Sequence, residues 1–260
     1  MGISGRITKD MRGDDKMIGI NDLKYTTVFI ADNTEESRHS FTGFIIKLAT
    51  SQGESYFLCS CGHCFDKNIM SISFVMSAID ENEEMSGVTF NITVSPIKHP
   101  SLDIAYVNIT NTIIKALNKY NIIFHFIEES DIILNDDRSS FNDLEDVYLV
   151  GYQAALGYTI LAYPFIIKGN TASSIQFNFQ NGFFTYANTK EGLSGCPVYI
   201  KVNEKYKLLG IHHSTRVRSL KITTDEFEKK YEESLGLSQE VYAFYTLDFI
   251  REQYPLVTEK

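Results

Sequence analysis

The sequence predicts an all-β protein, an antiparallel sandwich or a pair of β-barrels, with a helix near the C-terminal end. Short apolar runs rich in β-branched and aromatic residues recur along the chain, and Gly, Asn, Asp and Ser separate them. This is the pattern of successive strands joined by turns. About twelve such runs are present, which is more than one small barrel uses. They cover residues 26–31, 41–49, 55–60, 71–76, 88–94, 103–109, 121–127, 146–153, 158–167, 174–179, 197–202 and 206–212.

The runs fall into two groups, which we expect to form two barrels. Residues 24–126 make the first group, and residues 146–260 make the second together with the C-terminal helix. The segment 127–145 is acidic and poor in aliphatic residues at its centre, so it is expected to connect the two. Residues 1–23 precede the first run and are expected to be an N-terminal extension.

Three segments have the pattern of helices. Residues 111–120 are expected to form a helical turn or two before the connection. Residues 224–235 open with acidic side chains and stop at Gly236, which is typical of a capped helix. An acidic helix here is either a solvated surface helix or a contact for a regulatory protein. The segment 238–255 carries large apolar residues at helical spacing and ends in proline, which predicts the C-terminal helix.

Composition excludes several classes of protein. The 260 residues are 43% hydrophobic and 22% charged, which is the composition of a folded globular chain. A net charge of −9 argues against nucleic-acid binding, which normally needs a basic surface. No apolar run approaches the roughly 18 residues of a membrane span, and the N-terminal residues lack the apolar stretch of a secretory signal.

The four cysteines are a poor disulfide framework, because three of them fall within residues 59–64. Free thiols in a reducing cytosol are the simpler expectation, so the sequence predicts a cytoplasmic protein. Export by a route that needs no signal peptide stays open.

Residues 191–197, EGLSGCP, place Ser194 between two glycines, where a hydroxyl is accessible enough to act as a nucleophile. A serine needs an adjacent imidazole to accept its proton as it attacks. His63 is a candidate because it directly follows an apolar strand, whose end can hold the ring rigidly. Asp103 opens another apolar strand and is the candidate carboxylate that orients the histidine.

Four motifs in order, SCGHCF, LDIAYV, EGLSGCPVY and LLGIHHS, resemble those of the chymotrypsin-like (trypsin-like) serine proteases. The resemblance covers roughly residues 24–250. It implies two six-stranded antiparallel β-barrels, a C-terminal helix and an active site between the barrels. It also implies a triad of His63, Asp103 and Ser194, with the backbone N–H groups of Gly192 and Ser194 as the oxyanion hole.

Two departures from the family pattern matter. Leu193 stands where digestive relatives have the aspartate that pairs with a freed N-terminus, so activation by that cleavage is not expected. The family disulfide beside the histidine would use Cys64, but its partner position falls near Thr42 and Gly43, so the bridge is expected to be absent.

The stretch GIHHS is similar to the specificity-pocket strand of glutamyl endopeptidases and picornavirus-type processing proteases. The resemblance places Asn188, Thr189, His212 and His213 at the S1 pocket. An imidazole N–H and a hydroxyl would then donate to the side chain of a P1 Glu or Gln. Because Asn188 stands where trypsin has an aspartate, a basic P1 residue is disfavoured. A small or apolar P1 residue is the alternative.

The expected activity is that of a serine endopeptidase that forms an acyl-enzyme and needs no cofactor. The alternative from another class is a catalytically silent protease-like fold that binds proteins. Zinc held by Cys59, Cys61, Cys64 and His63 is disfavoured, because these residues are not expected to converge as a tetrahedral site needs. An α/β-hydrolase is disfavoured because its triad has the order Ser, Asp, His. The expected partners are a protein or peptide substrate and, as a further candidate, a regulatory protein.

Overall fold

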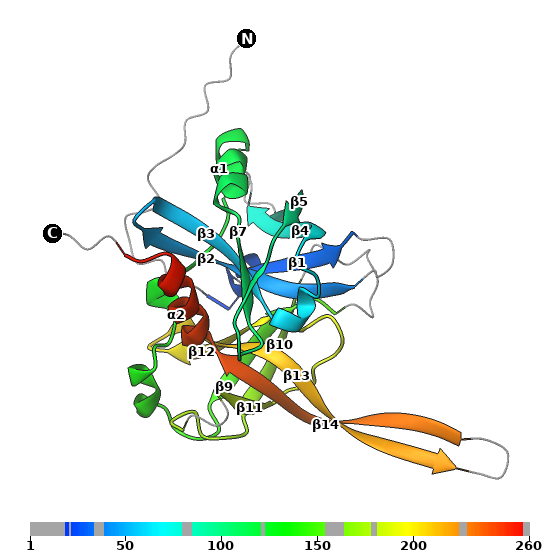
Figure 1. Cartoon of the computed structure of the whole chain (residues 1–260). Coiled ribbons are helices and arrows are strands. Elements are labelled where there is room, and N and C mark those ends of the chain that lie inside the picture. Colours follow the sequence, from blue (N-terminus) through cyan, green and yellow to red (C-terminus); the bar gives the residue numbers. More distant parts are fainter. Residues whose placement is uncertain are drawn as a thin grey trace.

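The computed structural model describes residues 19–20, 22–33, 39–79, 85–120, 123–153, 164–177, 181–223 and 228–256. Two β-sheets are stacked one above the other in the view of Figure 1, and the last helix lies along one side of the stack. Within the described ranges, no helix combines the length and apolar character that a membrane span requires.

The first sheet has eight strands. Seven follow the order β5-β4-β1-β2-β3-β7-β6, and β8 pairs in parallel with β2. Alternation explains the buried face, as in β4, where Met70, Ile72 and Phe74 are buried and Ser71 is exposed. The strands are β1 (Thr27–Asp32), β2 (Ser40–Thr50), β3 (Gly53–Ser60), β4 (Met70–Ile79), β5 (Met85–Val94), β6 (Ile97–Lys98), β7 (Ala105–Asn108) and β8 (Ile127–Glu128).

The second sheet is a closed barrel in the order β10-β11-β14-β13-β12-β9. Its strands are β9 (Asp146–Gly151), β10 (Phe165–Thr171), β11 (Gly182–Tyr186), β12 (Pro197–Val202), β13 (Lys205–Thr223) and β14 (Glu228–Tyr242). The predicted all-β class is therefore confirmed. The two sheets differ from the expected pair of six-stranded barrels, because the first has eight strands and its hydrogen-bonded path is not a closed ring.

Helices are few in the described part of the chain. The predicted helix at 111–120 is confirmed as α1 (Thr110–Lys119), and the C-terminal helix is confirmed as α2 (Ala243–Gln253). The α2 helix starts later than the pattern indicated, because residues up to Tyr242 belong to β14. Single 3-10 turns occur at η1 (Asp22–Thr26), η2 (Gly62–Cys64), η3 (Glu129–Asp131) and η4 (Asp136–Ser140).

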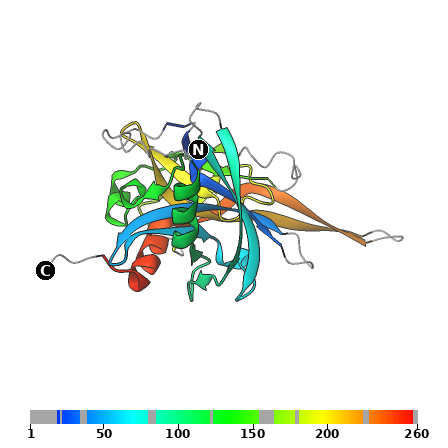
Figure 2. The same cartoon turned by 90° about the horizontal axis from the view of Figure 1, so that it is seen from above.

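The predicted helix at 224–235 is wrong. The ends of β13 and β14 pair with each other from Val217↔Ser234 to Thr223↔Glu228, and together they form a two-stranded ribbon that extends away from the barrel (Figures 1 and 2). Residues 224–227 lie outside the described residues. Capping signals failed here because cross-strand pairing with a distant segment outweighed a local helical preference.

Two predicted strands also differ from the structure. Ser174 belongs to no strand, residues 175–177 form bends, and the rest of that run lies outside the described residues. Of residues 123–127, Ile123 makes an isolated bridge to Ile79, and Ile127 alone belongs to a strand. The first part of the run 158–167 lies outside the described residues, and its last part belongs to β10.

One hydrophobic core is shared by both sheets and α2. Its fully buried members include Phe44, Cys59 and Tyr106 from the first sheet, Tyr199, Leu208 and Ile211 from the second, and Ala243 and Ile250 from α2. The end of the chain also bonds to the first sheet: Arg251 donates to the Ala49 carbonyl at 2.7 Å, and the Ser51 N–H donates to the Pro255 carbonyl at 3.1 Å. The two halves are thus held in a fixed relation.

Candidate active site

His63 lies on a short 3-10 turn, η2, that directly follows β3. The N–H of Cys64 donates to the Cys61 carbonyl at 3.2 Å and closes this turn. A Cβ at Gly62 would lie 3.0 Å from an Asp103 oxygen, so glycine allows the close approach of these two segments. The turn leaves the His63 side chain about half exposed, at 49%. An imidazole held at the end of a buried strand is therefore accessible from solvent.

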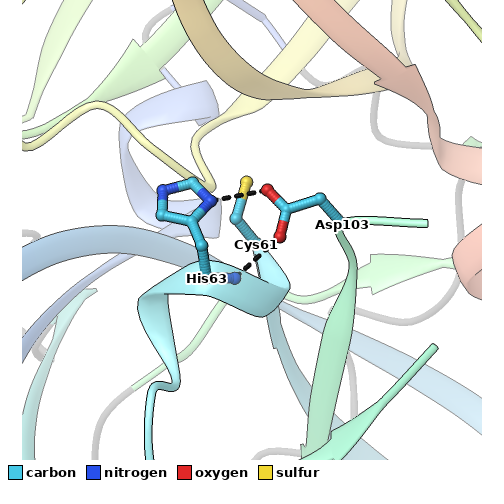
Figure 3. Close-up of side chains that lie close together, drawn as sticks. All are labelled: Cys61, His63 and Asp103. Carbon is cyan, nitrogen blue, oxygen red and sulfur yellow. Dashed lines mark hydrogen bonds and ion pairs between the residues drawn. The ribbon is translucent and has the colours of Figure 1, made fainter. Parts of the chain in front are cut away.

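Asp103 holds His63 by two bonds, drawn in Figure 3. One carboxylate oxygen accepts the backbone N–H of His63 at 2.7 Å, and the other lies 2.5 Å from the Nδ1 atom of the ring. Burial alone would raise the pKa of Asp103, but hydrogen bonds from His213 and His63 outweigh it and hold that pKa well below its usual range. The bond to Asp103, with a further contribution from Cys64, raises the pKa of His63 to about 10.

His213 is directed at Asp103 in the structure. Its Nε2 atom lies 3.1 Å from the same Asp103 oxygen that faces His63, and the two imidazole rings are 6.0 Å apart. Asp103 thus has a histidine on each side. We expected both His212 and His213 at the S1 pocket, but the β13–β14 register shifts between His212 and Ser214. Such a bulge redirects a side chain, and no local signal located it.

Ser194 lies in a loop with two glycines in left-handed conformations. Gly192 has φ +94° and Gly195 has φ +82°, which other residues adopt at a cost. Thr42 on β2 fixes this loop, because its N–H donates to the Ser194 carbonyl at 3.0 Å and its hydroxyl donates to the Gly192 carbonyl at 2.7 Å. Leu193 is fully buried in the core of the second barrel, among residues of β9 and β12. The loop is therefore anchored on both sheets.

The backbone N–H groups of this loop differ in their partners. Leu193 donates to the Lys190 carbonyl and Gly195 donates to the His212 carbonyl. Across the described residues, no hydrogen bond is found for the N–H groups of Gly192 and Ser194. Both are therefore available to a negatively charged oxygen next to Ser194.

A cleft of about 610 Å³ brings His63, Gly192 and Ser194 together, and Cys64 and Phe41 also line it. His63 comes from the first sheet and Ser194 from the second. Among the described side chains, the hydrogen-bond partner of His63 Nε2 is the Cys64 sulfur, at 3.7 Å. His63 and Ser194 thus line one cavity, and Asp103 is bonded to His63 behind it.

His212 is buried at 2% exposure and is paired with Glu240, a residue that the sequence analysis did not identify. Its Nδ1 atom lies 3.2 Å from one Glu240 oxygen, and Thr185 donates to the other at 2.7 Å. A glutamate in an otherwise apolar stretch, SQEVYAF, was the available signal. The pair forms because β13 and β14 place His212 opposite Glu240.

Thr189 and Asn188, two other S1 candidates, have no hydrogen bond to His212 among the described residues. Thr189 is buried and shares hydrogen bonds with Thr215 at 2.5 Å and with Ser238 at 2.9 Å. Asn188 is exposed. None of the four S1 candidates lines the described cleft.

One group of described side chains has the composition of a metal site. The ligand atoms of Cys61, His63 and Asp103 lie within 4.8 Å of one another. Zinc would need Cys61 as a thiolate, but burial raises the pKa of Cys61 well above its ordinary value. Asp103 is already engaged by His63 and His213. We therefore assign no metal to this group.

No family model and no curated protein sequence matches the chain. Among solved structures, the serine endoprotease from Yersinia pestis is similar with a TM-score of 0.51 and 15% sequence identity. That match covers 88% of this chain, and the chain spans 62% of the length of that protease. A product complex of catalytically active tobacco etch virus protease is similar over 91% of this chain and 82% of its own, with a TM-score of 0.49 and 12% identity. At these identities the likeness concerns the fold, which is a chymotrypsin-like double barrel.

Proposed function

We propose that the protein is a serine endopeptidase that acts through an acyl-enzyme intermediate. The observation that carries the proposal is the hydrogen-bonded pair of Asp103 and His63, which opens into the same cleft as Ser194. The order of the three residues along the chain and the double-barrel fold agree with this activity. A hydroxyl between two glycines, beside free N–H groups, is what acyl transfer requires.

Each residue has a defined step. The Ser194 hydroxyl attacks the scissile carbonyl carbon while His63 accepts its proton at Nε2. The resulting oxyanion receives hydrogen bonds from the N–H groups of Gly192 and Ser194. His63 then gives the proton to the departing amine, and water hydrolyses the ester by the same sequence of proton transfers. Asp103 keeps the Nδ1 atom of the ring protonated, so that Nε2 faces the serine.

His213 is proposed as a positioning residue. Its Nε2–H donates to Asp103 at 3.1 Å and limits rotation of the carboxylate. Thr42 has a comparable role for the serine loop, since it holds the carbonyl groups of Gly192 and Ser194.

Cysteine catalysis by Cys196 is disfavoured. Cys196 is fully buried, and burial raises its pKa well above the ordinary value, so the thiolate nucleophile is not formed. Ser194, two residues earlier, lines the cleft.

Cleavage after Gln or Glu is the proposed specificity. Glu240 holds Nδ1 of His212, which leaves Nε2 to meet an oxygen of the P1 side chain.

The test is covalent labelling with a fluorophosphonate probe. Wild-type protein should be labelled and Ser194→Ala should not, while Ser139→Ala, which changes an exposed serine outside the cleft, should label like wild type. A folded wild-type protein that never labels under reducing or oxidising conditions would instead support the binding module. For specificity, a peptide library should show P1 Gln or Glu enriched, and His212→Ala should lose that preference but still react with the small probe.

The binding module remains the second candidate for one specific reason. The described neighbour of His63 Nε2 is the Cys64 sulfur rather than the Ser194 hydroxyl. A protein that never used this histidine as a base could tolerate such a contact.

A further inference from the structure

Two cysteines flank the candidate base in the sequence Cys61-Gly62-His63-Cys64. The hydrogen bond from the Cys64 N–H to the Cys61 carbonyl closes a turn between them. In such turns the first and fourth α-carbons lie within about 7 Å. A disulfide spans α-carbon distances of roughly 4.4–6.8 Å. Both sulfurs also lie beside the His63 ring, that of Cys61 within 4.8 Å of a ring nitrogen and that of Cys64 3.7 Å from Nε2, so a covalent bond between them needs only local movement.

The two sulfurs have different surroundings. Cys61 is fully buried and donates to the His212 carbonyl at 3.1 Å, and burial raises its pKa well above the ordinary value. Cys64 is partly exposed and lines the cleft. The neighbouring Cys61 thiol, together with the His63 ring, outweighs burial and lowers the pKa of Cys64 to about 6. An accessible thiolate beside a buried thiol is the arrangement in which one cysteine is oxidised and the other resolves it.

Cys64 also bears on the candidate base. Its sulfur lies 3.7 Å from His63 Nε2, the atom that would accept the proton of Ser194. After the bond to Asp103, this contact is the next cause that raises the pKa of His63 to about 10. A protonated ring cannot act as a base, and a sulfur at Nε2 competes with the serine hydroxyl. The reduced cysteine therefore opposes catalysis.

We propose that Cys61 and Cys64 form a thiol–disulfide switch, in which oxidation by a hydroperoxide joins the two sulfurs and releases His63 for catalysis. The effect on catalysis rests on the proposed function, whereas formation of the disulfide does not.

The chemistry balances in two steps. The Cys64 thiolate attacks a peroxide oxygen, which breaks the O–O bond and gives a sulfenic acid and hydroxide. The Cys61 sulfur then attacks the Cys64 sulfur, and the S–O bond breaks to release a second hydroxide. The Cys61 proton and one proton from solvent convert the two hydroxides into water. A dithiol reductant reverses the process by thiol–disulfide exchange.

The remaining cysteines provide controls, because neither lies in the cleft. Cys59 is fully buried, its thiol donates to the Phe57 carbonyl at 3.4 Å, and burial raises its pKa above the usual range. Cys196 is fully buried in the core of the second barrel. Cys59→Ala removes a cysteine of the same segment without touching the pair.

The experiment treats the full chain with hydrogen peroxide or with dithiothreitol, and reads two signals. Non-reducing peptide mass spectrometry should show Cys61 and Cys64 joined after peroxide and both open to alkylation after dithiothreitol. At pH 7 the oxidised protein should react with the fluorophosphonate probe at least tenfold faster than the reduced protein. Cys59→Ala should behave like wild type in both signals.

Two variants test the direction of the switch. Cys64→Ala should label at the fast rate in both redox states, and Cys61→Ala should stay slow after peroxide because its Cys64 has no partner. Labelling that is unchanged or slower once the disulfide has formed would overturn the switch. A protein that labels but forms no Cys61–Cys64 disulfide also overturns it and leaves the protease proposal intact. A disulfide in a protein that never labels refutes the protease proposal and with it the catalytic effect, while the pairing of the thiols stands.

Discussion

Asp103→Asn is the sharpest perturbation of the proposed triad, because it exchanges one oxygen for an amide nitrogen without changing the shape of the side chain. In the wild type one oxygen accepts the His63 N–H at 2.7 Å, and the other faces Nδ1 at 2.5 Å. If the asparagine oxygen keeps the first bond, its NH₂ group faces Nδ1. The ring must then accept at Nδ1 and carry its proton on Nε2, where it cannot accept the proton of Ser194.

The expected loss follows from this change of tautomer. The wrong tautomer lowers the rate of acyl transfer by about 10⁴-fold in enzymes with this triad. That corresponds to roughly 5 kcal/mol of transition-state stabilisation. The pKa of His63 should also fall from about 10, since its largest cause is the Asp103 carboxylate.

The assay compares fluorophosphonate labelling rates of wild type, Asp103→Asn and the exposed control Asp143→Asn, each under the redox condition in which wild type reacts fastest. Circular dichroism of all three establishes that they are folded, and an NMR titration follows the His63 ring. The reasoning is refuted if folded Asp103→Asn labels within tenfold of wild type, or if the pKa of His63 does not move.

Three further outcomes are expected. Gly195 has φ +82°, and the new Cβ of Gly195→Ala would lie 1.9 Å from the Ser60 oxygen. The unfolding free energy in urea should therefore fall by about 2 kcal/mol or more, and a variant as stable as wild type would contradict the loop geometry. Tyr199→Phe removes a buried 2.6 Å hydrogen bond to Thr26 and should cost about 1 kcal/mol in the same titration, with labelling preserved. The pKa of His63 is raised in the folded chain, so its contribution to stability is complete below the ordinary histidine pKa and is lost as the pH rises toward about 10. The unfolding free energy of wild type should therefore fall more steeply over that pH range than that of His63→Ala, and parallel curves would contradict the pairing.

Much of the fold was predictable because the strands carry their own pattern. Runs such as 197–202 and 71–76 alternate or are β-branched, and each forms a strand at the expected place. The ribbon at the ends of β13 and β14 was not predictable, since its stability comes from pairing between distant segments. Eight strands in the first sheet likewise follow from contacts such as β8 with β2, which no local pattern specifies.

Candidate site residues were predictable where the residue type and its local sequence setting together indicate a chemical role. Ser194 between glycines and His63 after a strand are such positions, and both line the cleft. Glu240 and Thr42 were missed because each acts through a partner far away in the sequence. His213 was expected in the pocket, and a bulge that only the folded barrel reveals directs it to Asp103.

The contacts of α2 with both halves bear on the timing of assembly. This helix follows every other described element in the sequence, so it leaves the ribosome after them. Arg251 and Pro255 can bond to the first sheet only then. During synthesis the nascent chain therefore contains His63 and Ser194 before α2 has packed against the two halves, and any peptidase activity that needs this packing waits until α2 has emerged.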